Sequence, residues 1–471
     1  MTRIAGVGAY APSLRIGGEE FEAAWGAFDA PGIETKAVPD ADEDPLTMAA
    51  EAGRRAMNAG ETPPDQINWL GFATTTPPVE EGDLLPRLSS LLGIEPELTA
   101  HFGGSTRAGT QALVTGLETV DGGAGLVIAA DCSRGAPDHP EEHAAGAGAA
   151  AILLGADGAA VVERSDSGTV TPGLRFRRRG SEQTERLGVT AYERSAFRET
   201  VVEAIEGLDV ELSAIEAAAI QAPDGGLPYR AIRGLDLDAE AVGAVETVSA
   251  LGDTGAASPL LGLASALERD LDRTLVVGFG GGSGATALLV EGNAPVELAL
   301  DGEVDLDYPA YLRRRGELTS GPPEGGGAYV SVPTWVRSVP QRHQRIAGRC
   351  ADCGSLGFPP EGACPDCGAL GDYAPVALDR TGSVEAVTEI SQGGAPPEFI
   401  EQQARSGSYA SAIVAFDGPA GGSVSVPAQV VLVGGQSVAV GDRVDAVVRR
   451  IYTQEGVTRY GFKVVPAEAG P

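Results

Sequence analysis

The chain has almost no lysine, few cysteines and no long apolar run. Only two of its 34 basic residues are lysines, Lys36 and Lys463, and the net charge is -32 over 471 residues. A surface this acidic repels nucleic acid and anionic membranes, so we expect neither as a partner. No stretch reaches the roughly 18 apolar residues of a membrane-spanning helix.

The strong acidity is typical of a halophilic protein, because a short screening length at high salt tolerates dense like charge. An acidic protein from an ordinary cytoplasm is the alternative. Hydrophobic residues make up 43% of the chain, which favours a globular protein of two or three domains. Residues 1–8 lack the apolar core of a signal peptide, so we expect a cytoplasmic location and reduced thiols.

Four of the five cysteines form two C-x-x-C pairs, Cys350 with Cys353 and Cys364 with Cys367, with ten residues between the pairs. Two such knuckles at this separation are typical of a tetrahedral zinc site. Four thiolates would close the coordination shell, which predicts a structural zinc. A redox dithiol is the alternative. We expect the fifth cysteine, Cys132, to be a small buried residue.

Residues 1–292 alternate short apolar strands with amphipathic helices, which indicates α/β layers. The runs 125–131 and 146–155 are echoed by 274–280 and 282–290, and such a repeat predicts two related halves. Chance similarity between Gly/Ala/Val-rich strands is the alternative. The predicted strands are 4–9, 69–74, 125–131, 147–154, 217–221 and 274–278, and the predicted helices are 46–58, 84–92, 107–119, 196–205 and 259–269.

From about residue 293 this pattern ends. We interpret residues 293–340 as a linker, with a short helix at 308–316 and a glycine-rich connection at 321–327. Residues 341–370 hold the predicted zinc ribbon. Five alternating, β-branched runs predict a small β-barrel over residues 371–471, and these runs are 382–390, 409–416, 424–433, 443–452 and 458–464.

The segment 342–350, the ribbon itself and the motifs at 441–444 and 459–463 are similar to one known family. Residues 308–471 resemble the zinc-ribbon plus OB-fold, acyl-CoA-associated family often called DUF35. Its members accompany thiolase-fold enzymes and bridge or channel CoA thioesters, so the resemblance implies the same here. Nucleic-acid binding is the usual alternative for an OB-fold, but the acidic charge and the lack of a basic-aromatic pattern argue against it.

Residues 1–292 resemble archaeal 3-hydroxy-3-methylglutaryl-CoA synthase, a member of the thiolase superfamily. The motifs that carry this resemblance lie at 6–12, 42–47, 107–113, 130–137, 219–225, 251–254 and 278–284. The resemblance implies an internally duplicated α-β-α-β-α sandwich, in agreement with the repeat. It also implies a homodimer, or a pairing with another thiolase-fold subunit.

The synthase mechanism needs three side chains. A cysteine thiolate forms the acetyl-enzyme, a glutamate moves a methyl proton, and a histidine serves the carbonyl of the second substrate. The resemblance places Thr106, Thr75 and Gln221 at these three positions, so all three groups are replaced. A hydroxyl of Ser105 or Thr106 would need a strong neighbouring base to act as the nucleophile, and none is evident.

Four small residues are expected to form the substrate pocket, because they let a thioester carbonyl approach backbone N–H donors. They are Ser105, Gly252, Gly281 and Ser283. Close packing between the two halves is the alternative role for such small residues.

Four titratable residues near the predicted pocket have two interpretations each. His101 and His143 can face the cavity, but a structural hydrogen-bonding role is preferred. Glu141 and Glu142 can supply a base, but a solvated loop is preferred in so acidic a chain.

Three functions stay open at this point. The chain can be an enzyme of acyl transfer or C–C bond formation that works without the covalent cysteine. It can be a lyase similar to the thiolase-fold aldolases of the lipid-transfer type, with Tyr192 or Tyr229 as acid or base. It can also be a non-catalytic scaffold for an active thiolase-fold partner. All three take acyl-CoA as the ligand and structural zinc as the metal.

Overall fold

The computed structural model describes residues 2–302, 304–319, 331–391, 399–419, 421–431, 436–454 and 456–467. The chain forms two compact units. Unit 1 comprises Met1–Pro39, Asp44–Ser89 and Ile94–Tyr308. Unit 2 comprises Asp40–Glu43, Ser90–Gly93 and Pro309–Pro471. The predicted connection at 321–327 lies outside the described residues.

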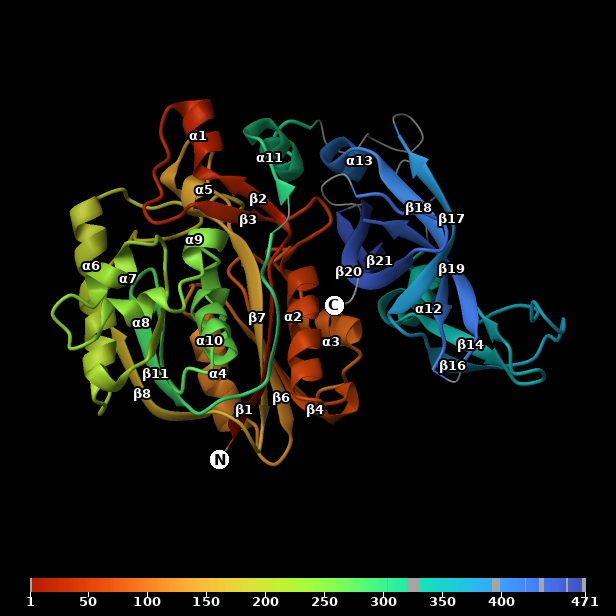
Figure 1. Cartoon of the computed structure of the whole chain (residues 1–471), viewed down its shortest axis with the longest axis horizontal. Helices are drawn as coiled ribbons and strands as arrows, with labels where there is room; N and C mark the ends of the chain where they lie inside the picture. Colours follow the sequence, from red (N-terminus) through yellow and green to blue (C-terminus); the bar gives the residue numbers. More distant parts are fainter. Residues whose placement is uncertain are drawn as a thin grey trace. The chain divides into compact units, whose positions relative to one another are not determined.

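Two sheets form the centre of unit 1 (Figure 1). The six-stranded sheet has the order β12-β1-β7-β6-β4-β5, and the four-stranded sheet has the order β8-β11-β10-β9. Their strands are buried runs of small and β-branched residues, as expected for sheets covered on both faces. The bounds in chain order are β1 Arg3–Tyr10, β4 Ile67–Ala73, β5 Leu98–Phe102, β6 Ala124–Cys132, β7 Ala147–Gly155, β8 Ala160–Gly168, β9 Ala217–Ile220, β10 Arg273–Gly280, β11 Gly284–Glu291 and β12 Val296–Ala299.

The two sheets repeat one pairing pattern. In both β1-β7-β6-β4 and β8-β11-β10-β9, the first two pairs are antiparallel and the third is parallel. Strand β6 therefore corresponds to β10, and β7 to β11. These are the strands of the sequence repeat, so the predicted duplication into two halves is confirmed.

Helices complete a five-layered α-β-α-β-α sandwich (Figure 1). Helix α2 (Pro45–Ala59) covers the six-stranded sheet, and α6 (Thr190–Glu206) covers the four-stranded sheet. Helices α4 (Ala108–Thr119) and α10 (Ser258–Glu268) pack between the sheets. Helix α10 is buried on all sides except at its last residue, which suits a helix in a middle layer. The predicted fold class is confirmed.

Close contact between the halves sets the position of the α4 N-terminus. A Cβ atom on Gly109 would lie 2.1 Å from the carbonyl oxygen of Ala256, and one on Gly278 would lie 2.2 Å from Thr110 Oγ1. No side chain fits at either point, so glycine allows α4 to approach the second half. Thr106, just before this helix, is fixed against β10 as a result.

Shorter elements surround this core. Strands β2 (Leu14–Gly17), β3 (Thr35–Val38) and β13 (Val304–Asp305) form a small sheet. The remaining elements of unit 1 are α1 Gly18–Trp25, α3 Leu85–Leu92, α5 Pro140–Ala144, α7 Leu227–Ala231, α8 Ala239–Gly243, α9 Val248–Leu251 and the 3₁₀ turns η1 Pro64–Gln66, η2 Leu212–Ala214 and η3 Gly255–Ala257. The predicted strands and helices of residues 1–292 all occur within two residues of their expected ends, except that α6 begins at Thr190 rather than 196.

Unit 2 contains a small sheet and a closed five-stranded barrel. Strands β14 (Ile346–Cys350), β15 (Leu356–Gly357) and β16 (Tyr373–Ala377) form the sheet. The barrel has the order β17-β18-β19-β21-β20, with β17 Thr381–Ile390, β18 Tyr409–Asp417, β19 Ser423–Val430, β20 Arg443–Gln454 and β21 Val457–Pro466. The predicted barrel is confirmed, although residues 432–433 of its third run lie outside the described residues. The other helices are α11 Tyr308–Arg315, α12 Val332–Gln344 and α13 Ile400–Ser406.

Both lysines of the chain are buried. Lys36 of β3 is 2% exposed, and its Nζ donates to the carbonyl oxygen of Glu142. Lys463 of β21 is fully buried and donates to Asp42 Oδ2 at 2.8 Å within unit 2. Burial lowers the pKa of Lys463, while the Asp42 carboxylate opposes that shift. Surface positive charge in the described chain is therefore carried by arginine.

Candidate functional site

The carboxylate of Asp131 is fully buried and lies at the end of β6, where the two halves of unit 1 contact each other. It accepts hydrogen bonds from the hydroxyls of Thr74, Thr75 and Thr76 at 2.8–3.0 Å. It also accepts from the backbone N–H groups of Thr75 at 2.6 Å, Thr76 at 2.9 Å and Ala256 at 2.7 Å. Because Ala256 belongs to η3 in the second half, this one side chain joins both halves.

Thr106 lies two residues before α4 and is 3% exposed. Its hydroxyl donates to the backbone carbonyl oxygen of Phe279 at 2.6 Å. A backbone carbonyl orients the hydroxyl but does not remove its proton. The hydroxyl is therefore held in place without being activated as a nucleophile.

Gln221 follows β9 and is 1% exposed. Its Nε2 donates to the carbonyl oxygen of Gly255 at 2.8 Å, and this bond fixes the orientation of the amide. Within the part of the chain that the structure describes, Gln221 Oε1 has no hydrogen-bond partner. The pocket wall thus presents a buried acceptor that lacks a donor.

Thr106 and Gln221 both line one pocket, whose volume is about 640 Å³ when its open mouth is included. Its size lies within the usual range for small-ligand sites. It is lined by Thr106, Ser133, Pro140, Glu141, Ala144, Ala145, Leu174, Arg175, Thr184, Glu185, Arg186, Gln221, Pro223, Asp253, Phe279 and Gly281. None of these lining residues is a histidine, cysteine, lysine or tyrosine, so carboxylates are the only general-base candidates in the described wall.

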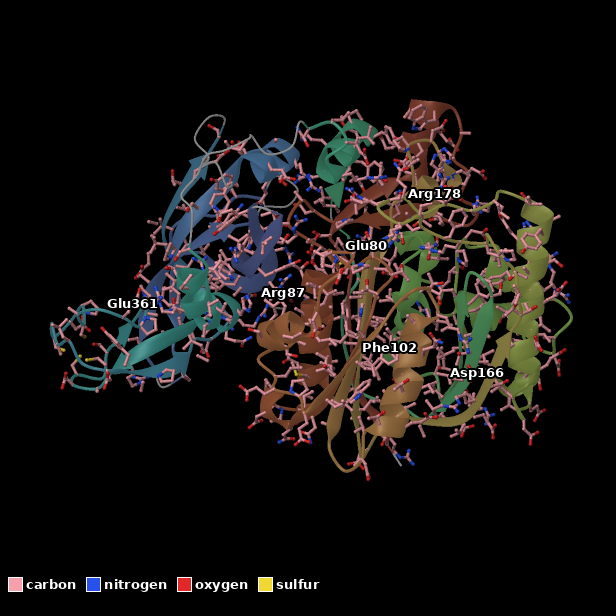
Figure 2. The ribbon with its side chains drawn as sticks, turned by 180° about the vertical axis from the view of Figure 1, so that it is seen from behind. Glu80, Arg87, Phe102, Asp166, Arg178 and Glu361 are labelled. Atoms are coloured by element: carbon pink, nitrogen blue, oxygen red, sulfur yellow. The ribbon has the colours of Figure 1, made fainter. Side chains whose placement is uncertain are left out.

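Arginine–carboxylate pairs account for the charge of the wall. Arg175 forms an ion pair with Asp253, and its Nη2 donates to Ser133 Oγ at 2.7 Å. Arg186 Nε lies 2.7 Å from Glu141 Oε1. The third carboxylate of the wall, Glu185, pairs with Arg178 of the same loop, which is labelled in Figure 2. Each lining carboxylate is therefore held by an arginine.

The one cysteine of unit 1, Cys132, is not a reactive thiol. Burial raises the pKa of the Cys132 thiol to about 12, with further contributions from the charges of Asp44 and Asp131. The thiol stays protonated near neutral pH, and the thiolate is the form that attacks. Cys132 is also absent from the pocket lining.

The histidines near the pocket have structural roles. His143 packs between the rings of Phe21 and Phe28, and its Nδ1 accepts from the backbone N–H of Asp29 at 2.9 Å. Burial lowers the pKa of His143. His101 lies against Phe72, and burial lowers its pKa as well. Neither histidine lines the pocket.

The solvated loop expected around Glu141 and Glu142 is wrong. Residues Pro140–Ala144 form helix α5, and Glu142 is fully buried and accepts from the backbone N–H of Asp138 at 2.8 Å. Glu141 lies in the pocket wall. The glutamates pack inward because buried N–H donors and arginines satisfy them, which outweighs the general acidity of the surface.

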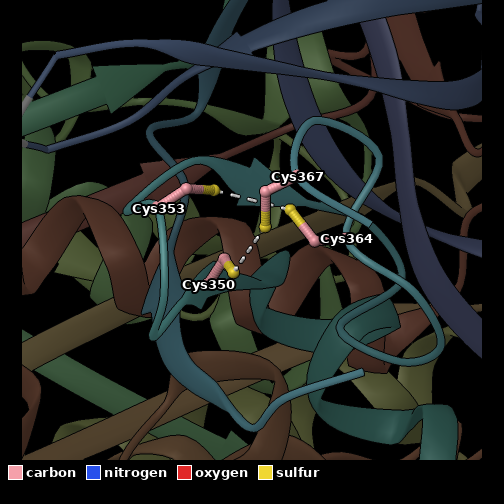
Figure 3. A group of neighbouring side chains, drawn as sticks. All are labelled: Cys350, Cys353, Cys364 and Cys367. Carbon is pink, nitrogen blue, oxygen red and sulfur yellow. Dashed lines mark hydrogen bonds between the residues drawn. The ribbon is translucent and has the colours of Figure 1, made fainter. Parts of the chain in front are cut away.

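The four clustered cysteines of unit 2 form a metal-shaped site (Figure 3). The sulfur atoms of Cys350 and Cys367 are 3.8 Å apart, and those of Cys353 and Cys364 are 3.6 Å apart. Tetrahedral zinc with Zn–S bonds of about 2.3 Å separates its sulfurs by about 3.8 Å, so these residues fit the metal. A disulfide needs about 2.05 Å and is excluded for these pairs.

The two knuckles share one backbone design. The N–H of Gly354 donates to the carbonyl of Cys350, and the N–H of Gly368 donates to the carbonyl of Cys364, both at 2.9 Å. Both glycines have positive φ, 78° and 73°, where a side chain would be strained. Hydrogen bonding from the backbone N–H of Cys367 lowers the pKa of Cys364 to about 6, which favours the metal-binding thiolate.

Comparison with known proteins assigns most of the chain. The hydroxymethylglutaryl-CoA synthase of Methanopyrus kandleri is 31% identical over 340 residues, covering 67% of this chain and 97% of that protein. The enzyme of the same name from Pyrococcus furiosus is 31% identical over 327 residues, covering 66% and 92%. The chain belongs to the hydroxymethylglutaryl-CoA synthase family. A family model for the rubredoxin-like zinc ribbon of ChsH2 also matches residues 342–371.

Solved structures agree on the fold of this family member. MvaS in complex with 3-hydroxy-3-methylglutaryl coenzyme A matches with a TM-score of 0.59 and 18% identity, covering 70% of this chain and 95% of that chain. FabH, the 3-oxoacyl-(acyl carrier protein) synthase III of Pseudomonas aeruginosa, matches with a TM-score of 0.56 and 17% identity, covering 63% and 99%. These matches place unit 1 in the thiolase fold.

The structure brings only some of the predicted family site together. Thr106, Gln221 and Gly281 line the pocket, whereas Thr75 does not, and its hydroxyl donates to Asp131.

No described helix has the length and apolar character of a membrane span.

The other three predicted pocket residues make packing contacts instead. A Cβ atom on Gly280 would lie 2.5 Å from Ser105 Oγ, and Ser283 Oγ is hydrogen-bonded to Thr171. Gly252 has a φ of 75°, and a Cβ atom there would lie 2.8 Å from the carbonyl of Ala144. The local structure around Ser105, Ser283 and Gly252 is therefore close contact with neighbouring residues, the alternative role considered for small residues.

Sequence reasoning missed the charged part of the wall, formed by Arg175, Arg186 and Asp253. A signal existed for the arginines, because residues 175–179 hold four of them in a chain that is otherwise very acidic. Asp253 lay within a motif used for the family resemblance, but the sequence held no sign of its distant arginine partner.

We expect Asp131→Asn to destabilise unit 1 by roughly 3 kcal/mol or more, because the amide nitrogen cannot accept from the surrounding donors. Urea denaturation followed by circular dichroism measures the change. Asp166→Asn is the matched control, since Asp166 is about half exposed, and it should cost under about 1 kcal/mol. Equal stability of the Asp131 variant and the parent would contradict the role given to this carboxylate.

We expect one zinc ion per chain in protein purified without chelator. Cys364→Ser should abolish metal binding and lower the thermal stability of unit 2, because three thiolates leave the shell open. Elemental analysis and differential scanning calorimetry test this. Cys132→Ser is the control and should retain a full equivalent of zinc, and a metal content unchanged in the Cys364 variant would rule out the assignment.

The lowered pKa of His143 predicts a loss of stability in mild acid. In the unfolded chain this histidine has a pKa near 6.5, so it takes up a proton more readily than the buried side chain does. The free energy of unfolding is therefore at its full value above about pH 6.5 and falls as the pH drops toward the folded pKa. His143→Gln should flatten this fall between pH 7.5 and 5.5 in urea titrations. His139→Gln, at an exposed histidine, should keep the parent slope; identical slopes in all three proteins would refute the prediction.

Proposed function

We propose that unit 1 binds an acyl-CoA thioester in this pocket without forming an acyl-enzyme, so that the chain is a non-covalent acyl-CoA-binding member of its family. The observation that carries the proposal is the state of Thr106, at the position of the family cysteine. Its hydroxyl proton is directed at the carbonyl of Phe279, and the carboxylates of the described wall are each paired with an arginine.

The other two family positions support the same conclusion. Thr75, at the glutamate position, donates to Asp131 and has no carboxylate with which to move a proton. Gln221, at the histidine position, can hydrogen-bond a ligand but does not exchange protons as an imidazole does. With these replacements, the site can bind a ligand but lacks the groups that carry out the family's reaction.

The class of ligand is supported by two lines of observation. Related folds have been solved as MvaS with 3-hydroxy-3-methylglutaryl coenzyme A and as HMG-CoA synthase with CoA. The pocket wall also includes two neutral polar side chains, Thr106 and Gln221, suited to a thioester and a small acyl group. Ligand binding would trap a water against Gln221, and that water would donate to the free Oε1, because the thioester itself has no donor.

Unit 2 completes the proposal. We assign Cys350, Cys353, Cys364 and Cys367 to a structural zinc, and the barrel to an OB-fold that helps to carry CoA thioesters. The proposed division is a thiolase-like domain at 1–292, a linker at 293–340, a ribbon at 341–370 and the barrel domain at 371–471. The zinc-ribbon match at 342–371 supports this reading.

The geometry does not favour the aldolase alternative. Tyr192 is partly buried, and its hydroxyl donates to the carbonyl of Pro172 at 3.1 Å. Tyr229 donates to Glu246 at 2.7 Å, and burial raises its pKa to about 12. Neither tyrosine lines the pocket, so neither is placed to transfer a proton to a ligand there.

We expect equilibrium dialysis with labelled acetyl-CoA to show saturable binding, and acid precipitation to leave no label on the protein. Gln221→Leu should weaken binding of both acetyl-CoA and free CoA by about 2- to 10-fold, the usual effect of one neutral hydrogen bond, because Oε1 accepts from a trapped water or from the CoA thiol. Val170→Leu, at a surface residue that is 88% exposed, is the control for both ligands.

Three results would overturn the proposed function. Acid-stable label would indicate an acyl-enzyme, steady release of CoA thiol would indicate turnover, and no binding of any CoA species would remove the ligand. Release of an aldehyde or ketone from a β-hydroxyacyl-CoA would establish the lyase instead.

A further inference from the structure

Residues 173–187 form a hairpin with a charge opposite to that of the chain. The N–H of Leu187 donates to the carbonyl of Gly173 at 2.9 Å, and Phe176 and Glu185 exchange backbone hydrogen bonds at 2.9 and 2.8 Å. We call this segment the arginine hairpin. It holds five arginines and two glutamates, a net charge of +3, in a chain whose net charge is -32.

The base of the arginine hairpin belongs to the pocket. Leu174, Arg175, Glu185 and Arg186 line the wall, and Arg175 is tied to Asp253 inside it. Arg177 anchors the hairpin further, because its Nη1 donates to the carbonyl of Thr75 at 2.5 Å. The hairpin is therefore attached to the same structure that fixes the pocket.

The tip of the arginine hairpin is exposed to solvent, and Figure 2 labels one of its residues, Arg178. The side chain of Arg178 is 73% exposed and that of Arg179 is 90% exposed. Arg178 lies 2.5 Å from Glu185, and Arg179 lies 2.9 Å from Glu80. Exposed pairs of this kind contribute little to stability, so both guanidinium groups are available for exchange onto a stronger anion.

A phosphate is such an anion. Guanidinium groups bind phosphate oxygens through paired, charge-assisted hydrogen bonds, and a local positive charge in an acidic protein attracts anions to one place. The hairpin leads from the pocket wall, where Arg175 and Arg186 are paired with carboxylates, to a tip whose arginines are exposed to solvent. This order matches a ligand with an uncharged acyl end and a phosphorylated far end.

We propose that Arg178 and Arg179 bind the phosphate groups of the CoA moiety, exchanging Glu185 and Glu80 for phosphate when the thioester enters the pocket. This inference rests on the proposed function and adds the subsite that selects CoA over smaller thioesters. Before the ligand arrives, Arg178 is held by Glu185 of the pocket wall, and Arg179 is held by Glu80.

The test compares three ligands on three proteins by isothermal titration calorimetry. The ligands are acetyl-CoA, acetyl-dephospho-CoA and S-acetyl-pantetheine. The proteins are the full-length parent, the double variant Arg178→Gln/Arg179→Gln, and the control Arg164→Gln. Arg164 is an exposed arginine of β8, outside the hairpin, and it pairs with Glu118. Circular dichroism and thermal unfolding establish that all three fold alike.

We expect the double variant to lose about 10- to 100-fold in affinity for acetyl-CoA, the effect of two charge-assisted contacts, and less for acetyl-dephospho-CoA. S-acetyl-pantetheine should bind all three proteins equally, and the control should match the parent throughout. Added salt should weaken acetyl-CoA binding to the parent more than to the double variant, since screening acts on the exposed charges.

The outcomes separate the two proposals. If the double variant binds acetyl-CoA as the parent does, the phosphate subsite is overturned and the proposed function stands. An equal loss for S-acetyl-pantetheine would also overturn the subsite, because the effect would then come from pocket shape. If the parent binds none of the three ligands, the proposed function fails and the subsite with it.

Discussion

The buried carboxylate of Asp131 is the interaction on which the rest of unit 1 depends. Six hydrogen bonds reach its two oxygens, from a turn after β4 and from η3 in the other half. A charge without solvent is tolerated only when it is fully hydrogen-bonded, so the surrounding backbone has little freedom to move. This constraint holds the strand ends together where the pocket begins.

The same constraint accounts for the contacts of two hydroxyls at positions that the family resemblance assigns to catalysis. Thr75 contributes its hydroxyl to Asp131 rather than facing a ligand, and Thr106 contributes its own to the backbone of β10. Both side chains now stabilise the junction of the halves. Under the proposed function, the family's proton-moving groups are replaced at these positions by groups that fix the local structure.

Much of the architecture was predictable because its causes are local. Buried apolar runs define β6, β7, β10 and β11, and the repeat between them follows from their shared spacing of glycine and branched residues. The zinc site was predictable for the same reason, since two C-x-x-C turns within one short segment need no distant partner. Helix α6 was predicted too short, because its first turns are polar and exposed and carry no apolar periodicity.

The parts that sequence alone could not supply depend on distant contacts. The six donors to Asp131 come from segments more than fifty residues away on either side. Glu142 reads as a surface residue until Asp138, Lys36 and Tyr308 are seen around it. The pairing of Arg175 with Asp253 joins positions 78 apart in the chain. In each case a polar residue is buried because a partner far along the chain meets it.

The burial of Lys36 and Lys463 has a chemical consequence if the chain holds thioesters as proposed. An activated acyl group transfers spontaneously to free amines, and the lysine ε-amine is the usual acceptor on a protein surface, whereas the arginine guanidinium stays protonated and unreactive. With both lysines enclosed and tied to carboxylate or carbonyl oxygens, the described surface exposes no lysine ε-amine. A bound thioester would therefore meet no exposed lysine of the described chain that it could acylate.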